Sequence, residues 1–272
     1  MLTTYTIDNH PYQVYRAGMD GPVLLFVHGF PINHAQWENQ FLHFAASYRV
    51  IAPDLRGLGG SKITGNDSII TMERHADDLN MLLDELHITE PVVFIGLSMG
   101  GYVAWQMVKK YPQRLRSLVF CDTRVAADTP EQAQARLQLA DETIKTGTSL
   151  KIEEVMLPRL LPASADHSIV DAIRQMARSA SPAGLAATLR GMAARIDAAP
   201  LLPSIKIPTL AISGEHDVIS PPAEMSAWAT KISNSRFVSL PGVGHMTPME
   251  APHEFNQLLT ESLPWLTGTT SR

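Results

Sequence analysis

A serine set between two glycines is the clearest sign of chemistry in this sequence. Residues 96–100 read Gly-Leu-Ser-Met-Gly, which fits the pattern Gly-x-Ser-x-Gly with Ser98 at its centre. The pattern follows an apolar run at 91–96 and precedes a helical pattern at 102–111. A tight strand-to-helix turn lifts such a serine clear of the sheet, and the glycines relieve the crowding around it. We therefore predict that Ser98 is a nucleophile; the alternative is a glycine-rich packing turn.

A serine hydroxyl is a weak nucleophile until a base removes its proton. His245 ends the stretch 241–245, Pro-Gly-Val-Gly-His, directly after the last apolar run of the chain. Glycines beside a histidine suit an open loop tip, because they allow backbone angles that other residues avoid. The other nine histidines lack this setting. His245 is therefore the predicted general base.

A third residue must orient the imidazole and stabilise its charged form. Asp217 closes the stretch 214–217, Gly-Glu-His-Asp, after another apolar run. The order serine, acid, histidine along the chain is typical of a serine nucleophile on this kind of turn. Asp122 is a rival, because it follows the preceding apolar run and an acid at that place can also reach the histidine. We predict Asp217 as the acid and keep Asp122 as the alternative.

An attacked carbonyl also needs two backbone N–H groups to hold the negative charge that develops on its oxygen. The N–H of Met99, directly after the predicted nucleophile, is one candidate donor. The other is the N–H of Phe30, in the stretch His28-Gly-Phe-Pro that ends an early apolar run. Pro31 has no N–H and cannot donate. We expect His28 to hold this loop rather than to act in catalysis.

These residues need a scaffold, and the apolar runs supply one. Six runs read as strands, at 23–27, 49–52, 91–96, 115–121, 208–213 and 236–240. Runs that are apolar on both faces are typical of parallel strands covered by helices on both sides. Helical patterns lie between them, for example at 71–87, where the apolar residues share one helical face. The sequence therefore predicts an α/β fold with a mostly parallel central sheet flanked by helices.

The pattern changes between 124 and 200, where no convincing strand occurs. The block is rich in Ala, Leu, Gln, Arg and Met, and its helix starts are marked by Thr129 before a proline and Ser181 before a proline. We expect a helical cap at 124–200, inserted into a core domain formed by 1–123 and 201–272. A last helix is expected at 252–265, followed by a frayed polar tail.

The cap should lie near the nucleophile, since loops at the carboxyl edge of a parallel sheet border its ligand crevice. Pro31, Met156, Leu157 and Met246 are the residues that we expect to line the substrate pocket. The acidic and basic residues of the cap balance, so its composition indicates no charged substrate.

Composition excludes several other classes of function. The chain has 272 residues, a formal charge of −5 and one cysteine, Cys121, so no intramolecular disulfide can form. The charge argues against nucleic acid or an anionic membrane as a partner. The sequence shows no signal peptide, no apolar run of about 18 residues and no Cys/His cluster. We expect a cytoplasmic protein that needs no metal or cofactor and binds a small molecule, either alone or as a homo-oligomer.

Five short stretches resemble signatures of the α/β-hydrolase superfamily, and together they span nearly the whole chain: 28–31, 54–61, 96–101, 214–217 and 244–245. Within it, the chain resembles the branch of 3-oxoadipate enol-lactonases, small carboxylesterases and cofactor-free haloperoxidases. That narrower resemblance rests on the short cap and on the stretches 156–158, 181–185 and 195–197. It implies the α/β-hydrolase fold, with a helical cap over a catalytic triad of Ser98, Asp217 and His245.

The expected activity is hydrolysis of a carboxylic ester or lactone through an acyl-enzyme intermediate. Two alternatives stay open: perhydrolysis at the same triad, in which peroxide replaces water, and a signalling receptor of this fold that mainly binds a small ligand. Dehalogenase and epoxide-hydrolase activities are disfavoured, because those relatives need a carboxylate where Ser98 stands.

Overall fold

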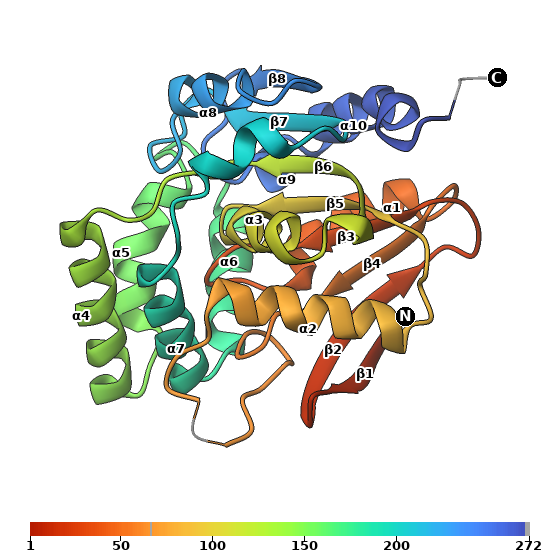
Figure 1. Ribbon diagram of the computed structural model, residues 1–272. Coiled ribbons are helices and arrows are strands. Elements are labelled where there is room, and N and C mark those ends of the chain that lie inside the picture. The colour runs from red at the N-terminus through yellow and green to blue at the C-terminus, as the bar shows by residue number, and fades with distance from the viewer. Residues whose placement is uncertain (66, 270–272) are drawn as a thin grey trace.

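A twisted sheet forms the centre of the protein (Figure 1). The structure is a computed structural model and describes residues 1–65 and 67–269. Within these residues, eight strands pair in the order β1-β2-β4-β3-β5-β6-β7-β8. β2 is antiparallel to β1 and β4, and all other neighbours are parallel. The strands are β1 (Leu2–Ile7), β2 (His10–Ala17), β3 (Val23–Val27), β4 (Arg49–Pro53), β5 (Val92–Leu97), β6 (Leu115–Cys121), β7 (Thr209–Gly214) and β8 (Ser235–Leu240).

The six strands read from the sequence are the six parallel ones, and the predicted fold class is confirmed. The hairpin of β1 and β2 was not among the predicted strands. Its residues alternate between exposed and buried positions, with partly polar side chains, because this edge of the sheet is covered less completely than the centre.

Helices cover both faces of the sheet and the carboxyl ends of its strands (Figure 1). The α-helices are α1 (Glu38–Phe44), α2 (Met72–Glu85), α3 (Met99–Lys110), α4 (Pro130–Thr146), α5 (Leu150–Leu160), α6 (His167–Ser179), α7 (Pro182–Ala193), α8 (Pro222–Ala229), α9 (Thr247–Glu250) and α10 (Pro252–Thr267). Short 3-10 helices lie at η1 (His34–Trp37), η2 (Pro112–Arg114) and η3 (Ala199–Ser204). Of the tail expected to fray, Thr267 still belongs to α10 and 270–272 lie outside the described residues.

Two hydrophobic cores lie on opposite faces of the sheet, because successive side chains of a strand point to opposite sides. In β5, Phe94 packs into the core shared with α2, α3 and α8, whereas Val93 and Ile95 pack into the core shared with α1 and α10. All three side chains are fully buried. The central strands are thereby held rigidly, and so are the loops at their carboxyl ends.

The helices α4 to α7 lie between β6 and β7 in sequence and sit beside the carboxyl ends of the parallel strands (Figure 1). We call these four helices the cap. The predicted helix starts are present: the Thr129 side chain caps α4, and the Ser181 side chain accepts a hydrogen bond from the N–H of Gly184 at 3.1 Å. Helix α7 contacts the core so closely that a Cβ on Gly184 would lie 1.9 Å from the carbonyl oxygen of Gly57.

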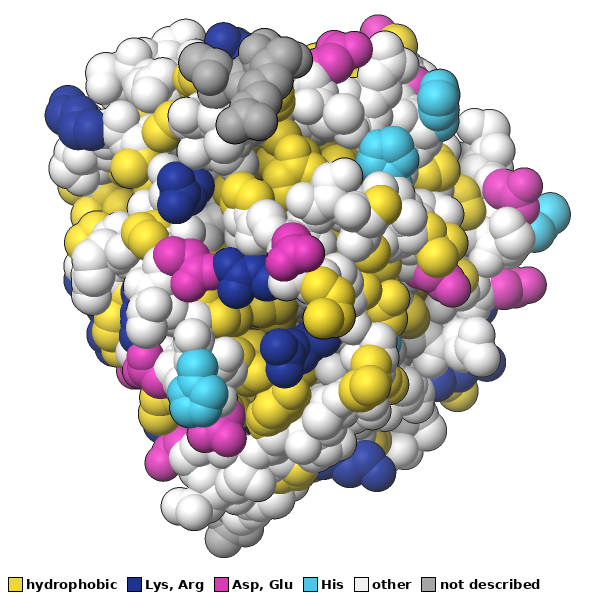
Figure 2. All heavy atoms as spheres, turned by 90° about the vertical axis from the view of Figure 1, so that its right-hand side faces the viewer, with side chains coloured by type: hydrophobic (Ala, Val, Ile, Leu, Met, Phe, Trp, Pro, Cys, Tyr) yellow, Lys and Arg dark blue, Asp and Glu magenta, His cyan; other side chains and the backbone are white. Residues whose placement is uncertain are grey.

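The face turned away from the cap carries charges of both signs. Figure 2 shows Lys and Arg side chains interspersed with Asp and Glu on this face, with hydrophobic patches between them. Among the described residues, no helix has both the length and the apolar character that crossing a membrane requires.

Candidate active site

Ser98 lies between the end of β5 and the first residue of α3. Its backbone angles are φ 52° and ψ −110°, a region that non-glycine residues rarely occupy. Two hydrogen bonds hold this turn: the N–H of Ser98 donates to the Cys121 carbonyl at 2.9 Å, and the Thr123 hydroxyl donates to the Ser98 carbonyl at 2.7 Å. Ser98 remains partly exposed, while its immediate neighbours are buried. A strained and accessible serine at a helix start fits a nucleophile position.

The flanking glycines are required by space. A Cβ on Gly96 would lie 2.6 Å from the carbonyl carbon and oxygen of Gly100. A Cβ on Gly100 would lie 2.3 Å from the carbonyl oxygen of Val27, in the neighbouring strand β3. Any larger residue at either place would push β5, α3 and β3 apart.

Asp217 and His245 form a buried pair. His245 Nδ1 lies 2.8 Å from Asp217 Oδ2, and the two side chains are 1% and 0% exposed. Burial by itself raises the pKa of Asp217, but the charge and hydrogen bond of His245 and the hydrogen bonds of Ser220 outweigh it. The result is that the pKa of Asp217 falls from 3.8 to about 2. The carboxylate therefore stays ionised beside the imidazole at neutral pH.

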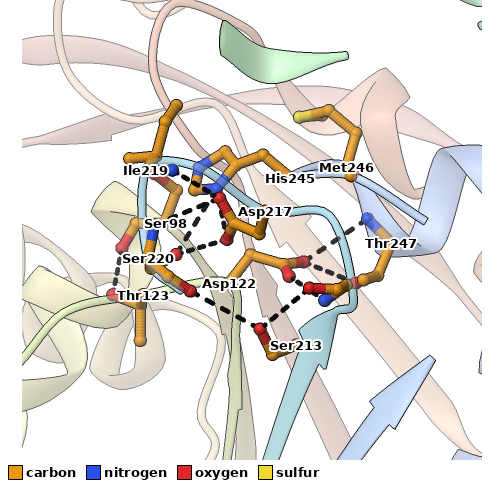
Figure 3. Close-up of polar contacts among 12 residues, drawn as sticks. Ser98, Asp122, Thr123, Ser213, Asp217, Ile219, Ser220, His245, Met246 and Thr247 are labelled. Carbon is orange, nitrogen blue, oxygen red and sulfur yellow. Dashed lines mark hydrogen bonds and ion pairs between the residues drawn. The ribbon is translucent and has the colours of Figure 1, made fainter. Parts of the chain in front are cut away.

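Asp122, the rival acid, forms hydrogen bonds with groups other than His245. Its Oδ1 accepts a hydrogen bond from the Gly214 N–H at 2.8 Å, and its Oδ2 accepts one from the Thr247 hydroxyl at 2.6 Å (Figure 3). Burial and the nearby charge of Asp217 raise the pKa of Asp122 well above 3.8. Of the two acids, only Asp217 contacts His245 in the structure.

Ser220 is a member of this group that the sequence did not reveal. Its hydroxyl donates to Asp217 Oδ2 at 2.5 Å and lies 3.4 Å from His245 Nδ1. The other carboxylate oxygen, Oδ1, accepts the N–H groups of Ile219 and Ser220 at 2.7 and 3.1 Å. These contacts fix the carboxylate plane toward the histidine. An aspartate that accepts the N–H groups two and three residues later forms the hydrogen bonds of an Asx turn, and an aspartate in a loop after a strand is the signal that could have indicated it.

The backbone around His245 is held from two sides. Glu250 accepts the N–H of Gly244 at 3.0 Å and the N–H of Met246 at 2.8 Å, so its carboxylate brackets the histidine. The N–H of His245 itself donates to the carbonyl of Leu160, the last residue of cap helix α5, at 3.1 Å. No local sequence pattern singles out Glu250, because its partners are backbone groups.

Ser98, Asp217 and His245 follow β5, β7 and β8, and Asp122 follows the intervening β6 (Figure 3). The carboxyl ends of these parallel strands meet at one edge of the sheet, which is why residues so far apart in sequence gather there. His245 Nε2 is buried and, within the described part of the chain, has no hydrogen-bond partner. The structure thus joins Asp217 to His245 directly, and it shows no hydrogen bond between His245 and Ser98.

Neither of the two candidate oxyanion donors, the N–H groups of Met99 and Phe30, has an acceptor in the part of the chain that the structure describes. Met99 is the first residue of α3, where a helix leaves its N–H unpaired. The N–H of Phe30 has no acceptor among the described residues. His28 supports the Phe30 loop: its Nδ1 bonds the Gly29 carbonyl at 2.8 Å and its Nε2 accepts the Leu55 N–H at 2.9 Å. Burial lowers the pKa of His28 from 6.5 to about 4, so the ring is neutral, in line with a structural role.

The predicted pocket residues do not all line one space. Met156 lines a cavity of about 140 Å³ between the cap and the core. Leu157 lines a different groove, between α5 and α6. Pro31 and Met246 are buried, the latter in the hydrophobic core that also contains Leu160.

The charged side chains that line the 140 Å³ cavity are mostly basic, whereas the composition of the cap as a whole is balanced. Its lining includes Arg124, Arg136, Arg159 and Arg195. Among the described residues that line it, Asp128 is the one acid. The charges balance over the cap as a whole but not locally, because α4, α5 and the segments that flank the cap each bring an arginine to the same cavity.

Comparison with known proteins agrees with this architecture. The sequence profile described as alpha/beta hydrolase fold matches residues 22–146. A 3-oxoadipate enol-lactonase of Acinetobacter baylyi is 28% identical over 239 residues, which are 87% of this chain and 86% of that protein.

Solved structures resemble the chain along its length. A thermophilic esterase from Thermogutta terrifontis, solved with malate bound, has a TM-score of 0.92 and 40% identity, and the match covers 98% of this chain and 99% of the esterase. An enol-lactonase from Burkholderia xenovorans shares the fold, with a TM-score of 0.87, 24% identity and coverage of 96% and 99%. With the serine turn, the parallel sheet and these matches in place, the chain belongs to the α/β-hydrolase fold family.

Proposed function

We propose that this protein hydrolyses a carboxylic ester or lactone, with Ser98, His245 and Asp217 as a catalytic triad. The observation that carries the proposal is the placement of a partly exposed serine on a strained turn and a buried Asp–His pair at the ends of neighbouring parallel strands. The similarity to an esterase and to enol-lactonases supports an ester or lactone as the substrate.

In the proposed reaction, Ser98 Oγ attacks the substrate carbonyl while His245 Nε2 takes the hydroxyl proton. Asp217 holds His245 through Nδ1 and stabilises the imidazolium that forms. The N–H groups of Met99 and Phe30 hold the negative oxygen of the tetrahedral intermediate. His245 then gives its proton to the leaving alkoxide, and the acyl group stays on Ser98.

A water molecule completes the cycle. His245 takes a proton from the water, whose oxygen attacks the acyl carbon, and the Ser98–acyl bond breaks. Ser98 regains the proton from His245 and the free acid leaves. The steps use no group beyond the triad, the two N–H donors and water.

We propose further that the block 124–200 acts as a cap that selects the substrate, while 1–123 and 201–272 do the chemistry. Two residues of cap helix α5 support this proposal. Met156 lines the cavity beside the core, and the carbonyl of Leu160 accepts the backbone N–H of His245.

Replacement of the nucleophile tests the proposal. Ser98→Ala should lower kcat for a 4-nitrophenyl ester by about 10⁶-fold if the triad acts as one unit. A fluorophosphonate probe should label the wild type at Ser98 only, as checked by peptide mass spectrometry. Ser204→Ala, a change at an exposed serine of η3, serves as the control and should keep both labelling and activity. Hydrolysis that survives Ser98→Ala would exclude the mechanism.

A further inference from the structure

The cavity between cap and core adjoins the proposed active site. It measures about 140 Å³, and both Tyr102 and Ile219 contribute to its wall. The N–H of Tyr102 donates to the Ser98 carbonyl at 3.3 Å, and the N–H of Ile219 donates to the Asp217 carboxylate at 2.7 Å. Two residues of the cavity wall are thus hydrogen-bonded through their backbones to the proposed nucleophile and its acid.

Part of the positive charge around the cavity is used to hold the cap in place. Asp128 pairs with Arg195 at 2.5 Å and with Arg136 at 2.7 Å, and the side chains of Asp128 and Arg195 are nearly fully buried. Arg195 also stacks over the Tyr102 ring at 4.3 Å and donates to the Ala126 carbonyl at 3.1 Å. These contacts join the start of the cap to its end.

The other two arginines of the cavity, Arg124 and Arg159, keep guanidinium N–H groups that are available to a ligand. Arg124 donates through Nε to Glu224 at 2.9 Å, which leaves its two Nη groups without partners in the described part of the chain. Arg159, on α5, is exposed and forms no ion pair with any described residue. The hydroxyl of Tyr102 likewise donates to no described group. Four arginines thus face two carboxylates, Asp128 and Glu224.

We propose that this cavity binds a free carboxylate carried by the substrate, so that the enzyme prefers esters or lactones of dicarboxylic acids over neutral ones. Guanidinium groups match a carboxylate in shape and charge, and a phenol hydroxyl beside them adds a neutral donor. A cavity several times larger than the about 30 Å³ that one liquid water occupies can hold such a group with part of its chain. This inference rests on the proposed ester or lactone hydrolysis at Ser98.

Matched substrates test the preference. Monoethyl succinate, glutarate and adipate would each be compared with the neutral ester in which an isopropyl group replaces the carboxylate, by pH-stat titration at pH 7.5. The best of the acidic esters should have a kcat/KM about tenfold or more above that of its neutral counterpart, as expected for a charge-assisted hydrogen bond. The free dicarboxylate of the same length should inhibit competitively.

Arg159→Gln should lower the ratio of the two kcat/KM values, acidic over neutral, by about tenfold. Because Arg159 pairs with no described group, its loss leaves no buried charge unpaired. Arg174→Gln is the matched control: it removes another exposed arginine, from cap helix α6, that does not line this cavity, and it should leave the ratio unchanged.

The outcomes separate the two proposals. If the wild type hydrolyses the neutral esters at least as well as the acidic ones, or if Arg159→Gln lowers both values equally, the carboxylate site is refuted while ester hydrolysis stands. If the wild type hydrolyses none of these esters, and Ser98 is not labelled by a fluorophosphonate, both proposals fail. An equal loss of the ratio in Arg159→Gln and Arg174→Gln would mean that only the overall charge of the cap matters, which also refutes the site.

Discussion

Ser98 combines backbone strain with support from its neighbours. A non-glycine residue at φ 52° costs of the order of 1–3 kcal/mol, and such conformations persist only where the surroundings enforce them. Here the Cys121 carbonyl and the Thr123 hydroxyl fix the turn from β6. The same turn places Met99 first in α3, where its N–H has no acceptor among the described residues, so one local distortion serves both the proposed nucleophile and a proposed oxyanion donor.

The contacts of the two acids predict very different effects on catalysis. Asp217→Asn should lower kcat by about 10⁴-fold, because the amide favours the wrong tautomer of His245. Asp122→Asn should have a far smaller effect, since Asp122 bonds Thr247 and Gly214 and its raised pKa favours a neutral carboxyl that asparagine resembles. Steady-state kinetics of both variants on one ester decide the matter. A larger loss for Asp122→Asn would show that the acid has been assigned wrongly.

At the scale of elements, the loop after β8 owes its shape to the short helix that follows it. Glu250 ends α9 and accepts N–H groups from both neighbours of His245, and burial raises its pKa above 4.5. Cap helix α5 supplies a third contact through the Leu160 carbonyl. Three hydrogen bonds from two elements, α9 and α5, thus hold the backbone that carries the imidazole. We therefore expect Glu250 to act as a positioning residue.

Removal of the Glu250 charge should loosen this frame without touching the substrate. We expect Glu250→Gln to lower kcat by about tenfold or more, because one of the two N–H groups would face an NH2 instead of an acceptor and the other would keep only a neutral one, while KM stays nearly constant. Glu254→Gln, at an exposed site one turn along in α10, is the control. A rise in KM with unchanged kcat would assign Glu250 to binding instead.

Sequence patterns predicted the parallel strands and the residues at their ends because both depend on local order. A buried strand must be continuously apolar, and the group that follows it lies at the carboxyl edge, whatever the rest of the chain does. Glu250 escaped prediction because it acts on backbone groups. The arginines of the cavity could not be predicted because composition gives no side-chain direction: Arg159 and Arg174 both lie on cap helices, and only Arg159 lines this cavity.

At the scale of the whole molecule, the buried carboxylates link the active site to the stability of the fold. The pKa of Asp217 is about 2 in the folded protein against 3.8 for its ordinary value. Because the folded-state value is the lower one, the ionised carboxylate stabilises the fold fully above pH 3.8. This contribution is lost as the pH falls through about 2.

Urea unfolding between pH 5 and pH 2 would measure this linkage. The wild type should lose about 2 kcal/mol of unfolding free energy over this range beyond whatever Asp217→Asn loses, since a shift of one pKa unit corresponds to about 1.4 kcal/mol. A difference between the two proteins that does not change with pH would contradict the lowered pKa of Asp217.

The hydrogen bond from the His245 N–H to the Leu160 carbonyl limits how freely the cap could be replaced by that of a related protein. If a cap contacted only the substrate, it could be exchanged between related proteins without changing the reaction at the active site. In this protein, the last residue of cap helix α5 also accepts the backbone N–H of His245 and so helps to position the histidine. A transplanted cap would have to present a carbonyl group at that same point, or the exchange would alter the rate of reaction along with the choice of substrate.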